Sequence, residues 1–78
     1  MSEEIEDEIR RQNVKWGEQN HSDIYWLGIL MEELGELAKE IIENGINGKV
    51  TDENIKTELI QVAAVAIQWL KCLNRKKQ

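Results

Sequence analysis

The feature that most constrains this chain of 78 residues is an apolar helical stripe with carboxylates on its border. From residue 30 to residue 41, apolar side chains recur at the i, i+3, i+4, i+7 spacing of a helix face that packs on a core. They are Leu30, Leu34, Leu37, Ala38 and Ile41. Glu33 and Glu36 border this face three residues apart, so they are neighbours on the helix surface. The stripe predicts a packed helical fold with acids at the edge of its core.

A second acid-bearing helix is predicted later in the chain. Glu58 and Gln61 have the same three-residue spacing, and they precede the apolar run Val62-Ala63-Ala64-Val65-Ala66-Ile67. Two such helices packed together would bring at least three carboxylates into one partly buried cleft, where like charges repel. This repulsion predicts a bound cation, and hard oxygen ligands suit Mg²⁺ or Mn²⁺.

Length and composition limit the fold class. The chain is expected to form one domain over residues 1–78, and a domain this small buries only about 60% of its unfolded surface, so partner subunits are expected. Proline and phenylalanine are absent, and most apolar residues are Leu, Ile, Val and Ala. This composition indicates an all-α protein.

The net charge and the cysteine content limit which classes of partner and which cellular compartments are expected. The formal net charge of −5 argues against a nucleic-acid polymer as partner, because phosphate backbones attract basic surfaces. The single Cys72 excludes an internal disulfide framework and fits a reducing compartment. No apolar run approaches the roughly 20 residues of a membrane span, and the acidic N-terminus is the wrong sign for a signal peptide. We therefore expect a cytoplasmic protein with no membrane partner.

The first and last segments are expected to be largely solvated. Residues 1–14 read as a charged helix with Ser2 as its N-cap and a thin apolar line. Arg10 and Arg11 could reach an anionic ligand from this helix, and the sequence leaves that question open. Residues 74–78 form a basic tail that complements a helix C-terminus.

The two longer helices are expected at residues 23–44 and 53–73. Ser22 or Asp23 would cap the first of them, Asn44-Gly45 would stop it, and Thr51 or Asp52 would cap the second. Between residues 62 and 70 only Gln68 is polar, and a helix that is apolar on all sides is buried on all sides. We therefore expect a three-helix chain that completes a four-helix bundle as a homodimer or homotetramer.

The segment between the first two helices carries an unusual set of side chains. It offers an aromatic ring, two carboxamides, an ammonium group and an imidazole, and such groups stack on a nucleobase and hydrogen-bond to its edge or to a ribose. The candidate substrate-binding residues are Lys15, Trp16, Gln19, Asn20 and His21. An alternative is left open, in which Trp16 plugs one end of the core and the polar side chains satisfy the loop backbone.

Three sequence segments resemble a known family. Glu32-Glu33-Leu34-Gly35-Glu36, followed on the next helix by Glu58-Leu59-Ile60-Gln61, resembles the EExxE…ExxD motif of the all-α nucleoside triphosphate pyrophosphohydrolases, the MazG-like superfamily. Lys15-Trp16-Gly17-Glu18-Gln19-Asn20-His21 and the run from 58 to 66 resemble a compact, single-domain MazG-like subgroup. The resemblance covers residues 15–73.

The resemblance implies a reaction and a cofactor. Family members cleave the α–β phosphoanhydride of a nucleoside triphosphate, which yields the monophosphate and pyrophosphate, and they use Mg²⁺ held by helix-borne carboxylates. Carried over by position, Glu33, Glu36 and Glu58 would be metal ligands, and Glu32 would bind metal or orient the attacking water. These four residues form the implied catalytic set. The segment from Lys15 to His21 would lie near base and sugar, with Lys15 or the basic tail as a further phosphate contact.

Gln61 departs from the family motif, which has aspartate at this position. Its carboxamide oxygen can coordinate Mg²⁺, but it is uncharged and is a weaker ligand for a second ion. The enzyme could work with fewer ions and keep Gln61 as a ligand, recruit Glu40 or Asp23 instead, or keep only nucleotide binding. Gln61 could equally form a hydrogen bond across the helix interface.

An alternative function belongs to a different class: a small acidic helical protein for interaction or assembly, without chemistry. It would account for the short length and for Gln61. It does not explain why Glu33, Glu36 and Glu58 border apolar faces, where an uncompensated carboxylate costs free energy.

Overall fold

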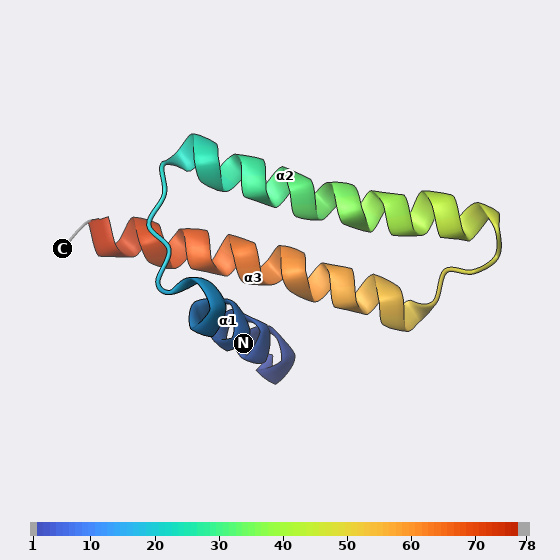
Figure 1. The fold of residues 1–78 in the computed structure, drawn as a ribbon, viewed down its shortest axis with the longest axis horizontal. Helices are drawn as coiled ribbons and strands as arrows, with labels where there is room; N and C mark the ends of the chain where they lie inside the picture. The colour runs from blue at the N-terminus through green and yellow to red at the C-terminus, as the bar shows by residue number, and fades with distance from the viewer. Residues whose placement is uncertain (1, 77–78) are drawn as a thin grey trace.

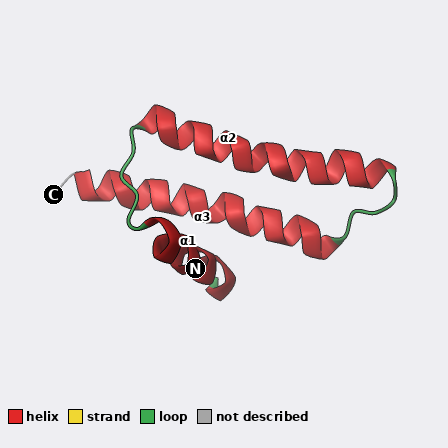
Figure 2. Ribbon diagram, viewed as in Figure 1, coloured by secondary structure: helices red, strands yellow, loops and turns green. Residues whose placement is uncertain are grey.

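Three helices make up the computed structural model, which describes residues 2–76 (Figure 1). Helix α1 spans Glu3–Trp16, and α2 spans Asp23–Lys39 and continues as a π-helical segment, Glu40–Asn44. Helix α3 spans Asp52–Lys76. Figure 2 shows helices joined by loops, with no strand in the described part of the chain. The predicted all-α class is therefore confirmed for residues 2–76.

Helix α3 is central because both other helices pack against it. Figure 1 shows α2 and α3 as a long antiparallel hairpin, with α1 beside α3. Over residues 2–76, no helix is long and apolar enough to cross a membrane.

Side-chain caps fix where the helices begin. In each case a serine or threonine oxygen accepts a hydrogen bond from the backbone N–H three residues later, at 3.1 to 3.3 Å. Such a cap satisfies one of the N–H groups that have no partner inside the helix, which stabilises the first turn by about 1 kcal/mol. The three caps are Ser2, Ser22 and Thr51. Of the alternatives left open by the sequence, Ser22 and Thr51 take the role rather than Asp23 and Asp52.

Three helix ends lie beyond their predicted positions. Helix α1 includes residues 15 and 16, so Lys15 and Trp16 lie on a helix rather than in a loop. After α2 the helical path passes through Gly45, which keeps a right-handed φ of −64°, and the chain turns at Gly48 with a φ of 67°. Helix α3 runs to Lys76 and takes in part of the predicted basic tail. The rest of that tail, residues 77 and 78, lies outside the described residues.

The core lies between the first half of α2 and the second half of α3. Trp26 is only 1% exposed and packs with Val65 and Cys72, and partly buried apolar side chains surround this cluster. They are Ile29, Leu30 and Trp69. On α1, Ile9 is the buried apolar residue, so α1 adds a smaller contact to the same central helix.

The large exposed apolar side chains gather on α2 rather than on α3. Residues 62–69 of α3 are buried or half-buried, since α1 and α2 cover them, and only Leu59 and Leu70 leave large apolar surface exposed on that helix. The apolar run on which the sequence-based prediction of a four-helix bundle rests is therefore largely covered within one chain. The side chains that lack cover on α2 and its π-helical extension are Ile24, Tyr25, Leu27, Met31, Leu34, Ile41 and Ile42.

The burial of Trp26 yields a test of the core. Replacing Trp26 by Ala is expected to lower the free energy of unfolding by about 3–5 kcal/mol, because it removes a large ring from a packed site. Trp16→Ala, at a residue 64% exposed, is the matched control and should change it by less than about 1 kcal/mol. Urea titration followed by circular dichroism measures both, and equal losses in the two variants would contradict the proposed core.

Candidate functional site

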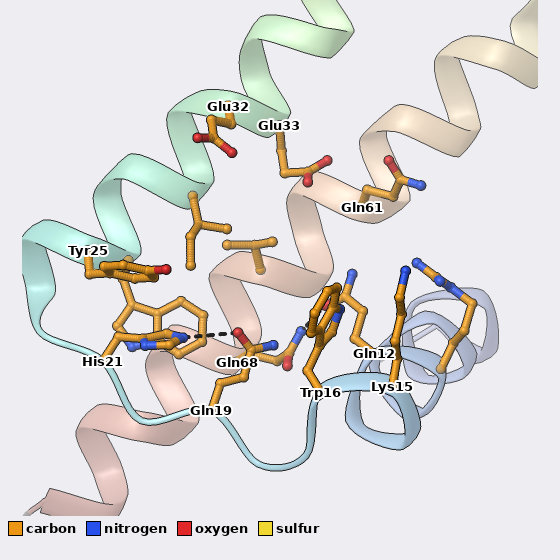
Figure 3. A pocket seen from close by; sticks show the side chains of 14 residues that line it. Gln12, Lys15, Trp16, Gln19, His21, Tyr25, Glu32, Glu33, Gln61 and Gln68 are labelled. Atoms are coloured by element: carbon orange, nitrogen blue, oxygen red, sulfur yellow. Dashed lines mark hydrogen bonds between the residues drawn. The ribbon is translucent and has the colours of Figure 1, made fainter.

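A cavity of about 600 Å³ opens among all three helices and the segment that joins α1 to α2 (Figure 3). This size lies within the range of about 300–1,000 Å³ that is typical of small-molecule sites. Its lining comes from α1 (Arg11, Gln12, Lys15, Trp16), the joining segment (Gln19, His21), α2 (Tyr25, Trp26, Ile29, Glu32, Glu33) and α3 (Gln61, Val65, Gln68).

One end of the cavity is aromatic. The His21 ring lies 4.4 Å from the Tyr25 ring and meets Trp26 edge-on at 4.9 Å, measured between ring centroids. Figure 3 shows Trp16 across the cavity from Tyr25, and Gln19 Oε1 lies 3.0 Å from His21 Nε2. Ring faces and carboxamides on facing walls can stack on a flat heterocycle and hydrogen-bond to its edge.

The other end of the cavity is acidic. Glu32 and Glu33 come from α2 and Gln61 comes from α3 (Figure 3). With its Nε2 turned toward the acids, Gln61 donates hydrogen bonds of 3.3 Å to Oε2 of Glu33 and to Oε2 of Glu58. The structure thus brings Glu33 of α2 to Glu58 and Gln61 of α3, which are at least 25 positions away in the sequence (58 − 33 = 25).

The acidic end has an electrostatic cost. The pKa of the Glu33 carboxyl is raised, first by burial and then by the charges of Glu58 and Glu36, with smaller contributions from Glu8 and Glu32. Like charges near a partly desolvated carboxyl disfavour its ionised form. A cation at this end would remove that penalty.

The donor chemistry of the acidic end fits a hard divalent cation. Two carboxylates and one carboxamide that can present its oxygen supply the kind of ligands that Mg²⁺ prefers. Within residues 2–76, no three His, Cys, Asp or Glu side chains form a ready metal cluster, so Gln61 is needed to complete a set of three donors. Glu36 adds its charge to this end although its side chain is exposed and does not line the cavity.

The two alternative acidic ligands have structural partners elsewhere. Glu40 accepts hydrogen bonds from the side-chain amides of Asn44 and Asn54, at 2.7 and 3.0 Å. Asp23 accepts a hydrogen bond of 3.0 Å from Trp69 Nε1. Glu40 and Asp23 therefore each form hydrogen bonds to α3 away from the acidic end of the cavity.

Four of the five predicted substrate-binding residues line the cavity, and Asn20 does not. Asn20 Oδ1 instead accepts hydrogen bonds from Arg75 Nε and Nη2, at 3.1 and 3.0 Å. Arg75 also donates to the backbone oxygen of Gln19 at 2.9 Å, and Lys76 Nζ donates to that of His21 at 3.4 Å. The end of α3, predicted as a tail for phosphate, thus holds the joining segment in place.

Two lining residues, Gln12 and Gln68, are not among the candidates that the sequence suggests, and Arg11 is one for which the sequence leaves a ligand contact open. Gln12 lies four residues before Trp16 and Arg11 four before Lys15, and this spacing is the signal that would place them on the same helix face as the predicted contacts. Gln68 is only 6% exposed, and its Nε2 donates to Gln12 Oε1 and, at 3.3 Å, to the backbone oxygen of Ala64. As the single polar residue of an apolar run, Gln68 also stood out in the sequence.

Comparisons with known proteins place no constraint on this site. No protein-family model matches the chain, no curated protein matches it, and no solved structure matches it.

The raised pKa of Glu33 predicts that removing its charge increases thermal stability, and that this increase depends on pH. A raised pKa means that the folded state favours the protonated carboxyl of Glu33. The stability that this protonated carboxyl contributes is therefore lost as the pH rises through its pKa in the folded protein. In metal-free buffer, Glu33→Gln should therefore melt at a higher temperature than the wild type near pH 7, and the gain should vanish below about pH 4.

Thermal melts over this pH range test the prediction. Glu43→Gln removes an exposed carboxylate from the π-helical segment after α2 and controls for the change in net charge. A gain that persists at low pH, or one that Glu43→Gln reproduces, would show that the crowding of charges around Glu33 is not its cause.

Proposed function

We propose that the protein is a metal-dependent nucleoside triphosphate pyrophosphohydrolase, which cleaves the α–β phosphoanhydride to give a nucleoside monophosphate and pyrophosphate. One observation carries the proposal: Glu33 and Gln61 line one end of a cavity whose other end is aromatic, and Gln61 joins Glu33 to Glu58, which lies just outside the lining. A ribo- or deoxyribonucleoside triphosphate needs both features, a ring surface for its base and a cation for its phosphates. The resemblance of the acidic segments to the MazG-like motif supports the same reaction.

The acidic end would hold Mg²⁺, or Mn²⁺, through Glu33, Glu58 and Gln61, and the charge of Glu36, which acts on Glu33, would add to the attraction of the cation. When bound, such an ion neutralises the triphosphate and activates water for attack on the anhydride. Glu32 lines the cavity beside Glu33 with an exposed side chain, a position from which it can orient the attacking water or bind metal.

The aromatic end would hold the nucleoside. Trp16 is 64% exposed and lies across the cavity from His21 and Tyr25 (Figure 3), so a base could stack on the ring of one of these walls. Gln19 already uses its Oε1 on His21, which leaves its Nε2 to donate to a base or sugar oxygen. Lys15 Nζ rests 4.8 Å from the centroid of the Trp16 ring and is within reach of a phosphate.

A second copy of the chain would cover the exposed face of α2 and give a homodimer. Ile24, Leu27, Met31, Leu34 and Ile41 follow one another at spacings of three, four, three and seven residues, with exposed fractions between 38% and 84%. Such a seam is typical of helices that pair along their length. Two α2–α3 hairpins would then complete a four-helix bundle, and a repeat of the pairing would give the tetramer.

Two glycines support this interface. Gly28 and Gly35 lie one heptad apart beside the seam, and a Cβ added at either would meet no atom within 4 Å. A glycine within a helix lowers helix stability by about 1 kcal/mol relative to alanine. These two glycines therefore destabilise α2 without allowing any close contact within one chain. A close approach by a partner helix would account for both.

The buried free thiol of Cys72 fits a reducing environment, which supports the cytoplasmic location.

One observation favours a second candidate function, nucleotide binding without catalysis. The Gln61 amide can satisfy Glu33 and Glu58 by direct hydrogen bonds, so the acidic end is partly compensated without any metal. An aspartate at this position could not do so at neutral pH.

Pyrophosphate release from a panel of ribo- and deoxyribonucleoside triphosphates with Mg²⁺ or Mn²⁺ tests the proposed reaction. Glu58→Gln should lower the rate at least about 100-fold, since loss of even an outer-sphere partner of a metal costs about 10–100-fold. Glu53→Gln, on the same helix but exposed and not joined to Gln61, should leave the rate unchanged. Binding of nucleotide without release, in a folded wild type, would instead establish the binding-only alternative.

The interface on α2 has its own test. Met31→Glu places a charge in the middle of the seam and should convert the dimer to a monomer in sedimentation equilibrium. Val14→Glu puts the same charge on an exposed apolar residue of α1 and should leave the mass unchanged. A wild type that sediments as a monomer at all concentrations would reject the interface.

A further inference from the structure

Helix α1 contributes two cations to the cavity. Arg11 and Lys15 lie four residues apart, so they share one face of the helix, and both line the cavity. The adjacent Arg10 forms an ion pair with Asp7 and does not line it. The structure therefore distinguishes the two neighbouring arginines, which the sequence left equivalent.

Arg11 is held in a fixed orientation by Glu8. Arg11 Nε donates to Glu8 Oε1 at 3.0 Å and Nη2 donates to Oε2 at 2.6 Å, which is the two-pronged geometry that arginine forms with carboxylates. Gln12 Nε2 donates to the same carboxylate at 2.7 Å. The hydrogen bond from Arg11 is the largest cause of the lowered pKa of Glu8, so this carboxylate stays charged.

Arg11 keeps donors for a ligand after this pairing. A guanidinium has five N–H donors, and Glu8 uses two of them. Half of the Arg11 side chain is exposed, while that of Glu8 is largely buried beneath it. The free donors therefore lie on the accessible part of the pair.

Arg11 also lies near the acidic end of the cavity. Besides Glu8, the charge of Glu33 raises the pKa of Arg11, so the guanidinium lies within the field of that carboxylate. Arg11 of α1 and Gln61 of α3 both line this cavity and also a neighbouring groove, so both lie at the border between the two hollows. An anion bound between this arginine and a cation at the acidic end would meet positive charge on both sides.

We propose that Arg11 binds the polyphosphate of the ligand, with Glu8 holding its guanidinium in place. This proposal rests on the proposed function and specifies which side of the cavity the phosphates occupy. Planar guanidinium donors match phosphate oxygens and form strong charge-assisted contacts.

The test measures binding of inorganic tripolyphosphate, in the presence of Mg²⁺, by isothermal titration calorimetry. Arg11→Gln should raise the dissociation constant about 10- to 100-fold, the usual effect of losing a hydrogen bond to a charged group. Arg10→Gln makes the same change in net charge on the neighbouring residue and should stay within about twofold of the wild type. Equal weakening in both variants would mean that Arg11 acts only through overall charge, and would overturn the proposal.

Glu8→Gln breaks the same ion pair and keeps the cation. It should weaken tripolyphosphate binding much less than Arg11→Gln does, and equal effects would mean that the ion pair supports the fold rather than the ligand. Circular dichroism checks that all three variants are folded.

The outcomes separate this proposal from the proposed function. If the wild type binds tripolyphosphate and nucleotide but Arg11→Gln binds them equally well, only the role of Arg11 is rejected. If the wild type binds neither, both the role of Arg11 and the nucleotide function are rejected.

Discussion

The packing of Trp26 against α3 is the contact on which the rest of the structure depends. Its ring is buried with Val65 and Cys72, and this fixes which face of α2 turns toward α3. Glu33 lies two turns later on the same face, so it is carried into the interface, where it meets Gln61. One apolar contact thus forces a carboxylate into a position that it would not occupy by its own free energy.

The second half of α3 determines the shape of the opposite end of the cavity. Trp69 binds Asp23 at the start of α2, and Arg75 binds Asn20 and the backbone of the joining segment. These contacts cross more than forty positions of sequence, and together they hold the His21 ring against Tyr25. Side chains of α3 that do not line the aromatic end of the cavity therefore hold its aromatic residues in place.

Opposite charges are segregated on the two long walls of the cavity. Glu32 and Glu33 lie on α2, while Arg11 and Lys15 lie on α1. A bound polyphosphate with its cation has charges of both signs, and it could match both walls at once, whereas a neutral ligand would leave them uncompensated. Gln61 is placed at the junction, where its amide can turn either its N–H groups or its oxygen toward the acids.

The sequence by itself determined the helical class and, to within one residue, where the helices start, because periodicity and caps are local properties. It also predicted that acids of two helices meet, and the structure brings Glu33 to Glu58 and Gln61 but leaves the Glu36 side chain exposed. Only the tertiary structure decided that Arg11 lines the cavity while Asn20 does not, and that the uncovered apolar face belongs to α2. Those outcomes depend on which helix lies in the middle. An apolar run shows that a helix will be covered, but not which neighbours cover it.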